Sequence, residues 1–214
     1  MIRLLLLIAV IALIFRVAST PANAATITND GITILYEGEV VQSDVTRMEE
    51  MLDNTGIKTV FLDSPGGNAM TGYQLGYLFH DKGIRLVIGG DASCFSACAI
   101  AFLGGEERTK LGLLGFHVAW TTNTESMSEG MKQGQVYGTI TAAYFFRMGY
   151  SLQLPYMISM YTDKDTFLML DVEDLNMFKL ESMEDFIELK DLPPLWAANR
   201  IAGPMRRELM IRGM

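Results

Sequence analysis

The sequence predicts an α/β fold, because short apolar runs of the length of buried strands alternate with segments of helical periodicity. The apolar runs lie at residues 32–36, 59–62 and 85–88, and turn-forming residues bound them. The 214-residue chain has no internal repeat, low-complexity tract or interior linker. We therefore expect a single domain with a sizeable core.

Two segments with helical spacing separate these runs. The first begins after Ser43, whose hydroxyl is suited to cap a helix, and ends at Gly56. The second carries apolar residues from Leu75 to Phe79 on one face and ends at Gly83. The expected order is strand, helix, strand, helix, strand.

Three further elements follow. We expect a short buried helix at 97–103, a strand at 113–118 and a long helix at 126–148. Small residues recur every four positions in the long helix and so lie along one line of its surface, namely Gly130, Gly134, Gly138 and Ala142. Glycine inside a helix costs roughly 0.5–1 kcal/mol relative to alanine, so close approach of another backbone is expected here. The alternative is that the first half of this segment is a loop.

The N-terminus has the layout of an export signal. Arg3 precedes an uncharged apolar run at 4–15, and the small residues of Ala22-Asn23-Ala24 follow. The run is shorter than the roughly 20 residues of a spanning helix. We expect cleavage after Ala24 and a periplasmic or secreted mature chain. If the segment is retained, it would anchor the protein to the membrane, facing the periplasm.

Charge and composition exclude several functions. Removing residues 1–24 takes away two arginines and no acidic residue, which lowers the net charge from −8 to −10. A strongly acidic chain without a basic patch is not expected to bind nucleic acid. Two histidines and two cysteines do not build a four-ligand metal site, and no phosphate-binding glycine loop is present, so we expect no metal and no cofactor.

The chain divides into a signal peptide at 1–24, an α/β domain at 25–190 and a basic tail at 191–214. A proline pair at Pro193-Pro194 marks the start of the tail, and four arginines follow it. We expect this tail to be a peripheral arm or a docking segment.

A Pro-Gly-Gly turn directly follows the run at 59–62. Pro65 fixes its own φ, and Gly66 and Gly67 permit a sharp turn with bare backbone N–H groups. Such groups can stabilise a developing oxyanion.

A second turn of small residues leads from the strand at 85–88 into the helix at 97–103. Ser96 lies at this junction, where the helix N-terminus favours negative charge and a serine hydroxyl can act as a nucleophile. The simpler interpretation is that Ser96 only caps the helix. Ser93 competes with it for either role.

A histidine and two aspartates complete the set of candidates. His117, on the strand at 113–118, is a better general base than His80, which lies in an ordinary helical segment. Asp163 and Asp165 could each orient the histidine, and the sequence does not choose between them.

In this order the motifs resemble those of the Clp protease proteolytic subunit and, more closely, exported Clp-protease-like proteins of the Clp protease and crotonase superfamily. They are Ser64-Pro65-Gly66-Gly67, Cys94-Phe95-Ser96-Ala97-Cys98, Gly115-Phe116-His117 and Asp165-Thr166-Phe167-Leu168, and the resemblance spans about residues 32–180.

The resemblance implies a spiral of β-β-α units and a serine peptidase. Ser96 would be the nucleophile, His117 the base and Asp165 the orienting acid, with an oxyanion hole from the N–H groups of Gly67 and Ala97. It also implies a homo-oligomer that assembles through the helix at 126–148. An exported protein has no ATP-driven unfoldase beside it, so peptides or unfolded proteins would be its substrates.

Cys94 and Cys98 depart from the cytosolic protease, which has small or flexible residues there. In an oxidising compartment they could form a disulfide that clamps the turn, or remain two buried thiols.

Three alternative functions stay open. The chain could be a non-catalytic binding or scaffold module of the same fold. It could be a serine–lysine peptidase with Lys110 or Lys132 as base, although neither lies in a motif. A crotonase-type acyl-CoA enzyme is disfavoured, because export removes the protein from the CoA pool.

Overall fold

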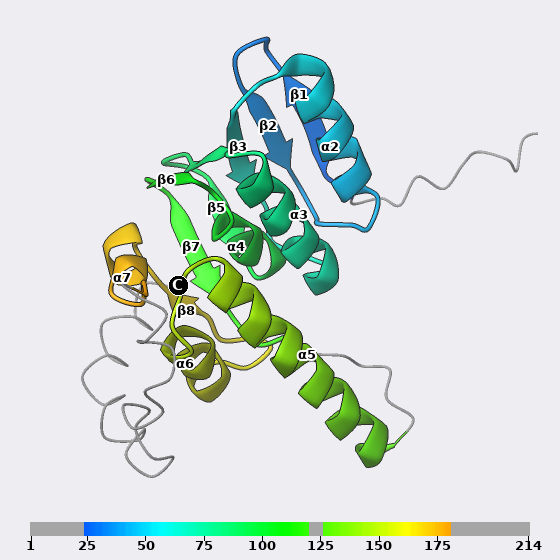
Figure 1. Cartoon of the computed structure of the whole chain (residues 1–214), viewed down its shortest axis with the longest axis vertical. Coiled ribbons are helices and arrows are strands. Elements are labelled where there is room, and N and C mark those ends of the chain that lie inside the picture. Colours follow the sequence, from blue (N-terminus) through cyan, green and yellow to red (C-terminus); the bar gives the residue numbers. More distant parts are fainter. Residues whose placement is uncertain (1–23, 120–125, 181–214) are drawn as a thin grey trace, which may run out of the picture.

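The computed structural model describes residues 24–119 and 126–180, and the expected signal peptide and basic tail lie outside them, apart from Ala24. Its main sheet has five strands in the order β1-β2-β3-β4-β6 (Figure 1). The bounds are β1 Thr26–Asn29, β2 Ile34–Glu37, β3 Thr59–Asp63, β4 Arg85–Ile88 and β6 Glu107–Lys110. β1 is antiparallel to β2, and the other neighbours are parallel.

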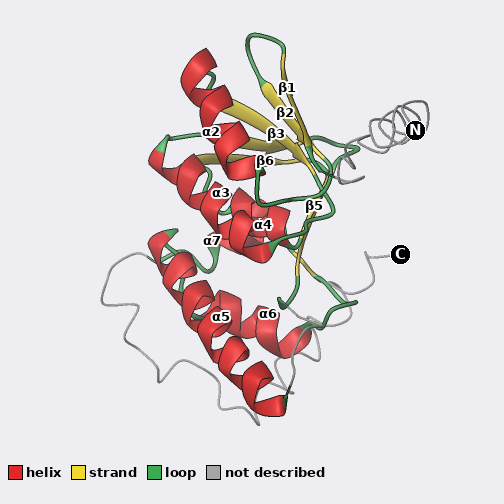
Figure 2. Ribbon diagram, turned by 90° about the vertical axis from the view of Figure 1, so that its right-hand side faces the viewer, coloured by secondary structure: helices red, strands yellow, loops and turns green. Residues whose placement is uncertain are grey.

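Three helices lie on one side of this sheet, as Figure 2 shows: α2 (Asp44–Thr55), α3 (Ala69–Asp81) and α4 (Ala97–Phe102). Buried residues alternate with less buried ones along β2 and β3, and the strand register aligns Ile34, Val60 and Leu86 in one buried row. Burial of this face against the helices forms the core.

A second sheet has the order β5-β7-β8, with bounds Ser93–Phe95, Leu113–Phe116 and Leu168–Met169. Two isolated β-bridges extend this second sheet toward the N-terminal part of the described chain. One pairs Ser64 with Cys94, and the other pairs Val40 with Gly67. A main-sheet strand, a short segment of the second sheet and a helix thus recur along the chain. This β-β-α repetition confirms the predicted α/β fold class.

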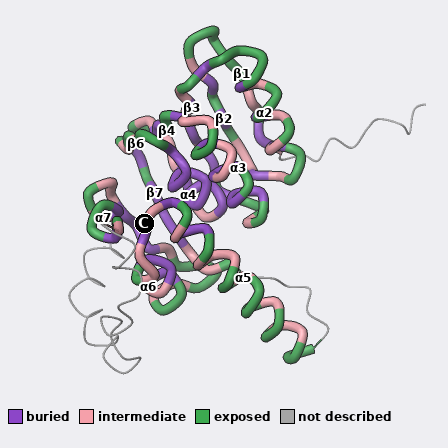
Figure 3. The backbone as a smooth tube through the Cα atoms, viewed as in Figure 1, coloured by how far each residue is buried: buried purple, intermediate pink, exposed green. Residues whose placement is uncertain are grey.

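The C-terminal part of the described chain is largely helical. It comprises α5 (Met127–Arg147), α6 (Gln153–Tyr161) and α7 (Val172–Asn176). α5 extends away from the sheets (Figure 1), and its first two thirds are exposed or half-buried (Figure 3). Ser126 caps α5 by accepting a hydrogen bond from the N–H of Glu129 at 3.2 Å. The long helix is therefore formed, and the loop alternative is wrong.

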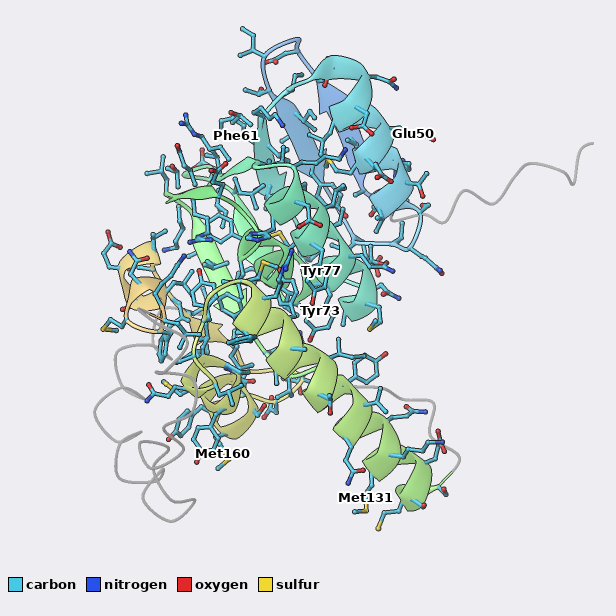
Figure 4. All side chains as sticks on the ribbon, viewed as in Figure 1. Glu50, Phe61, Tyr73, Tyr77, Met131 and Met160 are labelled. Carbon is cyan, nitrogen blue, oxygen red and sulfur yellow. A yellow bond between two sulfur atoms is a disulfide. The ribbon has the colours of Figure 1, made fainter. Side chains whose placement is uncertain are left out.

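α5 returns to the core near its end. Tyr73 and Tyr77 of α3, labelled in Figure 4, each pack edge-on against Tyr144, with ring centroids 5.1 Å apart. Tyr144 is fully buried and donates a hydrogen bond to the carbonyl of Ile100 at 2.6 Å. These contacts fix α5 beside α3 and α4. Across the described ranges, we find no helix that combines the length and the apolar character needed to cross a membrane.

Candidate active site

Ser96 occupies a sharp bend between β5 and α4. Its φ of 56° makes it the one non-glycine residue with a positive φ among residues 24–119 and 126–180. Its N–H donates to the carbonyl of Gly115 at 2.9 Å, which anchors the bend to β7. A non-glycine residue keeps this backbone conformation only where its surroundings hold it, and such outliers cluster at functional sites.

The hydroxyl of Ser96 contacts His117 across 21 residues of sequence. Oγ lies 2.6 Å from Nε2, and Ser96 makes no side-chain hydrogen bond as cap of α4. The capping interpretation of Ser96 is therefore wrong. The competing Ser93 lies on β5, where its N–H donates to Oδ1 of Asp63 at 2.9 Å.

His117 directly follows the end of β7 rather than lying within a strand as predicted. Its Nδ1 lies 3.3 Å from the backbone carbonyl oxygen of Asp163. Because a carbonyl only accepts, Nδ1 carries the proton in the neutral ring and Nε2 presents its lone pair to the Ser96 hydroxyl. Burial lowers the pKa of His117 below its usual 6.5, although hydrogen bonds to the 163–164 backbone oppose the shift.

The loop after α6 packs against the His117 ring. Phe167 stacks on His117 with centroids 4.6 Å apart, and Val118 N–H donates to the hydroxyl of Thr162 at 3.0 Å. The histidine is thereby fixed between β7 and this loop.

The structure corrects the expectation for Asp165. Its carboxylate is 72% exposed and pairs with Lys164, so it does not reach His117. Asp163, and not Asp165, contacts the imidazole, and it does so through its backbone carbonyl oxygen. Its carboxylate accepts from the N–H groups of Asp165 and Thr166 at 2.8 and 2.9 Å, bonds that lower the pKa of Asp163 and shape the loop. Sequence alone cannot indicate a role carried by a backbone carbonyl.

The Gly66-Gly67 turn lies directly against the serine. A Cβ built on Gly66 would come within 2.6 Å of the Cβ of Ser96, and φ is +97° at Gly66 and +142° at Gly67. In the described part of the chain the N–H groups of Gly67 and Ala97 have no hydrogen-bond partner. Two backbone donors near Ser96 are thus available for a ligand.

A buried carboxylate that the sequence reasoning missed supports this turn. Asp44 is fully buried and accepts hydrogen bonds from Tyr36 Oη at 2.7 Å and Val41 N at 2.8 Å. The adjacent Val40 pairs with the turn, since its N–H donates to Gly66 O at 2.7 Å. The sequence signal for Asp44 is an acidic residue in the first turn of a helix, which is also common in helices without a buried carboxylate.

Cys94 and Cys98 are joined by a disulfide that spans the bend. No group of three His, Cys, Asp or Glu side chains suited to a metal ion occurs within residues 24–119 and 126–180.

Ser96 and His117 border a cavity of about 1000 Å³. Small residues of α5 form part of its wall, namely Gly130, Gly134, Gly138 and Ala142. Apart from the chain neighbours and the backbone of α5 itself, no atom of the described residues lies within 4 Å of a Cβ built on Gly134 or Gly138. The predicted glycine line therefore faces the cavity and is open in the single chain.

The remaining candidates for a base do not line this cavity. His80 is exposed near the end of α3, Lys132 is exposed on α5, and Lys110 pairs with Asp171. His117 is thus the titratable side chain that the structure brings to Ser96.

No protein-family model and no curated protein matches this sequence. Among solved structures, the chain is similar to the 1510-N membrane-bound stomatin-specific protease in a serine-to-alanine variant, with 15% identity, a TM-score of 0.49, and coverage of 70% of this chain and 75% of that one. It is also similar to ClpP1 from Listeria monocytogenes, with 19% identity, a TM-score of 0.48, and coverage of 70% and 88%. An asparagine-to-aspartate variant of ClpP1 from the same organism gives 17% identity, a TM-score of 0.48, and coverage of 73% and 95%. At these identities, the assignment of function depends on the geometry of the site itself.

Proposed function

We propose that this chain is a serine hydrolase, and specifically a peptidase, with Ser96 as nucleophile and His117 as general base. The observation that carries the proposal is the 2.6 Å contact between Oγ and Nε2 at a positive-φ bend. A serine hydroxyl is a poor nucleophile at neutral pH unless an adjacent base takes its proton. The neutral tautomer inferred for His117 leaves Nε2 free to do so.

The geometry supports the following sequence of steps. Oγ of Ser96 attacks the scissile carbonyl carbon while Nε2 of His117 takes the hydroxyl proton. The N–H groups of Gly67 and Ala97 stabilise the negative charge that develops on the carbonyl oxygen. His117 then gives the proton to the leaving amine, which leaves an acyl group on Ser96. Water then attacks the acyl carbon while His117 takes its proton, the bond between that carbon and Oγ breaks, and His117 returns the proton to Oγ as the carboxylic acid product leaves.

The proposed catalytic unit is a Ser–His dyad positioned by a backbone carbonyl. The carbonyl of Asp163 fixes the tautomer and orientation of His117, which is the role an aspartate carboxylate has in a triad. Among the described residues, no carboxylate is hydrogen-bonded to the ring, and the charge of Asp163 acts on His117 only through space, so the positive charge of the intermediate imidazolium is stabilised less than in a triad. We therefore expect a slower enzyme than a triad peptidase.

We propose peptides and unfolded proteins as substrates. The cavity beside Ser96 has a volume of about 1000 Å³, and its α5 wall carries small residues that leave room for a backbone. We also propose a homo-oligomer, because Met127, Met131 and Val136 are largely exposed on the projecting part of α5 (Figure 4 labels Met131).

We place this activity outside the cytosol, in the periplasm or as a secreted protein, with a mature chain that starts near Ala25. The signal layout at 1–24 and the disulfide between Cys94 and Cys98 support this location, since disulfides persist in oxidising compartments.

The test is hydrolysis of a fluorescently labelled unfolded protein by the mature chain without nucleotide. Wild type should release fluorescent peptides, and Ser96→Ala should not, while Ser93→Ala should retain the activity. Equal activity in wild type and Ser96→Ala would refute the assignment.

A non-catalytic binding module is the second candidate, and it is favoured because the described hydrogen bonds of His117 Nδ1 involve a backbone carbonyl and no carboxylate. Such a module would bind unfolded peptides with the same affinity in wild type and Ser96→Ala, and neither protein would cleave them.

A further inference from the structure

The disulfide between Cys94 and Cys98 brackets the serine, because Ser96 lies two residues from each cysteine. Both cysteines are buried, with exposed fractions of 0% and 1%. Their Cα atoms are 5.2 Å apart. The bridge therefore connects the middle of β5 to the first turn of α4 across the bend.

The two sides of the bend are held by different contacts. On the strand side, Cys94 lies inside the second sheet, paired with Ser64 and with Leu114. On the helix side, α4 lacks the side-chain cap that commonly fixes a first turn, because the Ser96 hydroxyl contacts His117. The disulfide thus constrains the helix at the position where the cap is missing.

We infer that this disulfide is a positioning element for the reaction: it holds Ser96 toward His117 and keeps the Ala97 N–H in place. This inference rests on the proposed function. A positive φ at a non-glycine residue persists only where the surroundings over-determine it, and the bridge is a covalent part of those surroundings. Because the bridge closes a very short loop, it restricts the unfolded chain less than a long-range disulfide would. Its loss should therefore affect the site more than the fold.

The experiment compares the oxidised mature chain with two proteins that lack the bridge. One is wild type reduced with dithiothreitol, in which each sulfur gains one electron and one proton while the reagent closes into its own cyclic disulfide. The other is the Cys94→Ser/Cys98→Ser double variant, whose hydroxyls are close in size to thiols. Free-thiol counts after denaturation verify each redox state, and dithiothreitol added to the double variant controls for other effects of the reagent.

Two readouts are measured on each protein. The first is the rate constant of fluorophosphonate labelling at Ser96, which we expect to fall between about tenfold and 10²-fold without the bridge, the scale of a misplaced reacting group. The second is amide hydrogen exchange, which should accelerate at Ser96 and Ile100, whose N–H groups donate to the carbonyls of Gly115 and Ser96, and stay unchanged within 59–63 of β3. The second readout requires no catalytic activity.

Unchanged exchange at Ser96 and Ile100 after verified reduction would overturn the inference, and so would an unchanged labelling rate in a protein that labels when oxidised. Faster exchange throughout the chain would also overturn it, because the bridge would then stabilise the whole fold. If the oxidised wild type does not label, the proposed hydrolase function fails, and the exchange result alone decides whether the bridge holds the bend.

Discussion

Gly66 and Ser96 approach each other so closely that the glycine position has no room for a side chain. A Cβ on Gly66 would lie 2.6 Å from the Cβ of Ser96 and 2.6 Å from the carbonyl oxygen of Phe95. The Pro-Gly-Gly turn and the Ser96 bend are therefore built as one unit, in which a change on either side displaces the other.

We predict that Gly66→Ala removes activity, because the new methyl group must push Ser96 away from His117. The matched control is Gly31→Ala. Gly31 has a similar φ of +88° but nothing within 4 Å of its Cβ position. The control should lose about 1 kcal/mol of stability from its backbone conformation and keep its activity. Similar activities in the two variants would mean that the close approach of Gly66 to Ser96 is unimportant.

Substitutions in the loop beside His117 should separate Asp163 from Asp165. Asp163→Ala loses the acceptor for two backbone N–H groups and should lower the labelling rate about tenfold, or about 1.4 kcal/mol, by releasing the carbonyl that orients His117. Asp163→Asn should be milder, because an amide oxygen can still accept. Asp165→Asn should leave the rate within about twofold, since its carboxylate is exposed. A large loss in Asp165→Asn would restore the triad assignment.

The pH dependence of activity should report the environment of His117. Its neutral form is the base, and burial lowers its pKa below 6.5, so the labelling rate should rise with pH and reach half of its plateau below pH 6.5. The same pKa shift makes His117 destabilise the fold as pH falls below 6.5, because the folded state resists protonation. A midpoint above pH 6.5 would mean that burial does not dominate the environment of His117 and would contradict this prediction.

Asp44 should contribute to stability far more than an exposed acid does. Asp44→Ala leaves the buried Tyr36 hydroxyl and the Val41 N–H without their acceptor and should lower the free energy of unfolding by about 3 kcal/mol. The control, Asp53→Ala, breaks a partly exposed pair with Lys82 and should cost at most about 1 kcal/mol. Denaturant unfolding measures both, and equal losses would argue against a supporting role for Asp44.

Sequence patterns predicted the elements that bury a regular face and missed those that do not. β3 and α2 follow from apolar runs and spacing, and the C-terminus of α2 at Gly56 is confirmed by its φ of 67°. β6 (Glu107–Lys110) was missed because its residues are polar, half-buried or exposed at the sheet edge, and hydrogen bonding to β4 alone makes it a strand.

The site was predictable to the extent that it depends on side chains in motifs. Ser96 and His117 were singled out from sequence, and the structure brings them together. The orienting group was not predictable, because it is the backbone carbonyl of Asp163, and carbonyls carry no sequence signature. The orientation of the α5 glycine line was also undetermined, since periodicity defines a helix face without indicating what it faces.

The most direct test of the proposed nucleophile is fluorophosphonate labelling of the mature chain followed by peptide mapping. Covalent capture requires an activated serine and an oxyanion site together. Wild type should carry the label on Ser96, Ser93→Ala should label equally, and His117→Ala should label at least about 10²-fold more slowly. Lys110→Ala and Lys132→Ala should leave the rate unchanged. A folded wild type that stays unlabelled between about pH 6 and 9, or that carries the label on another residue, would contradict the assignment of Ser96 as an activated nucleophile.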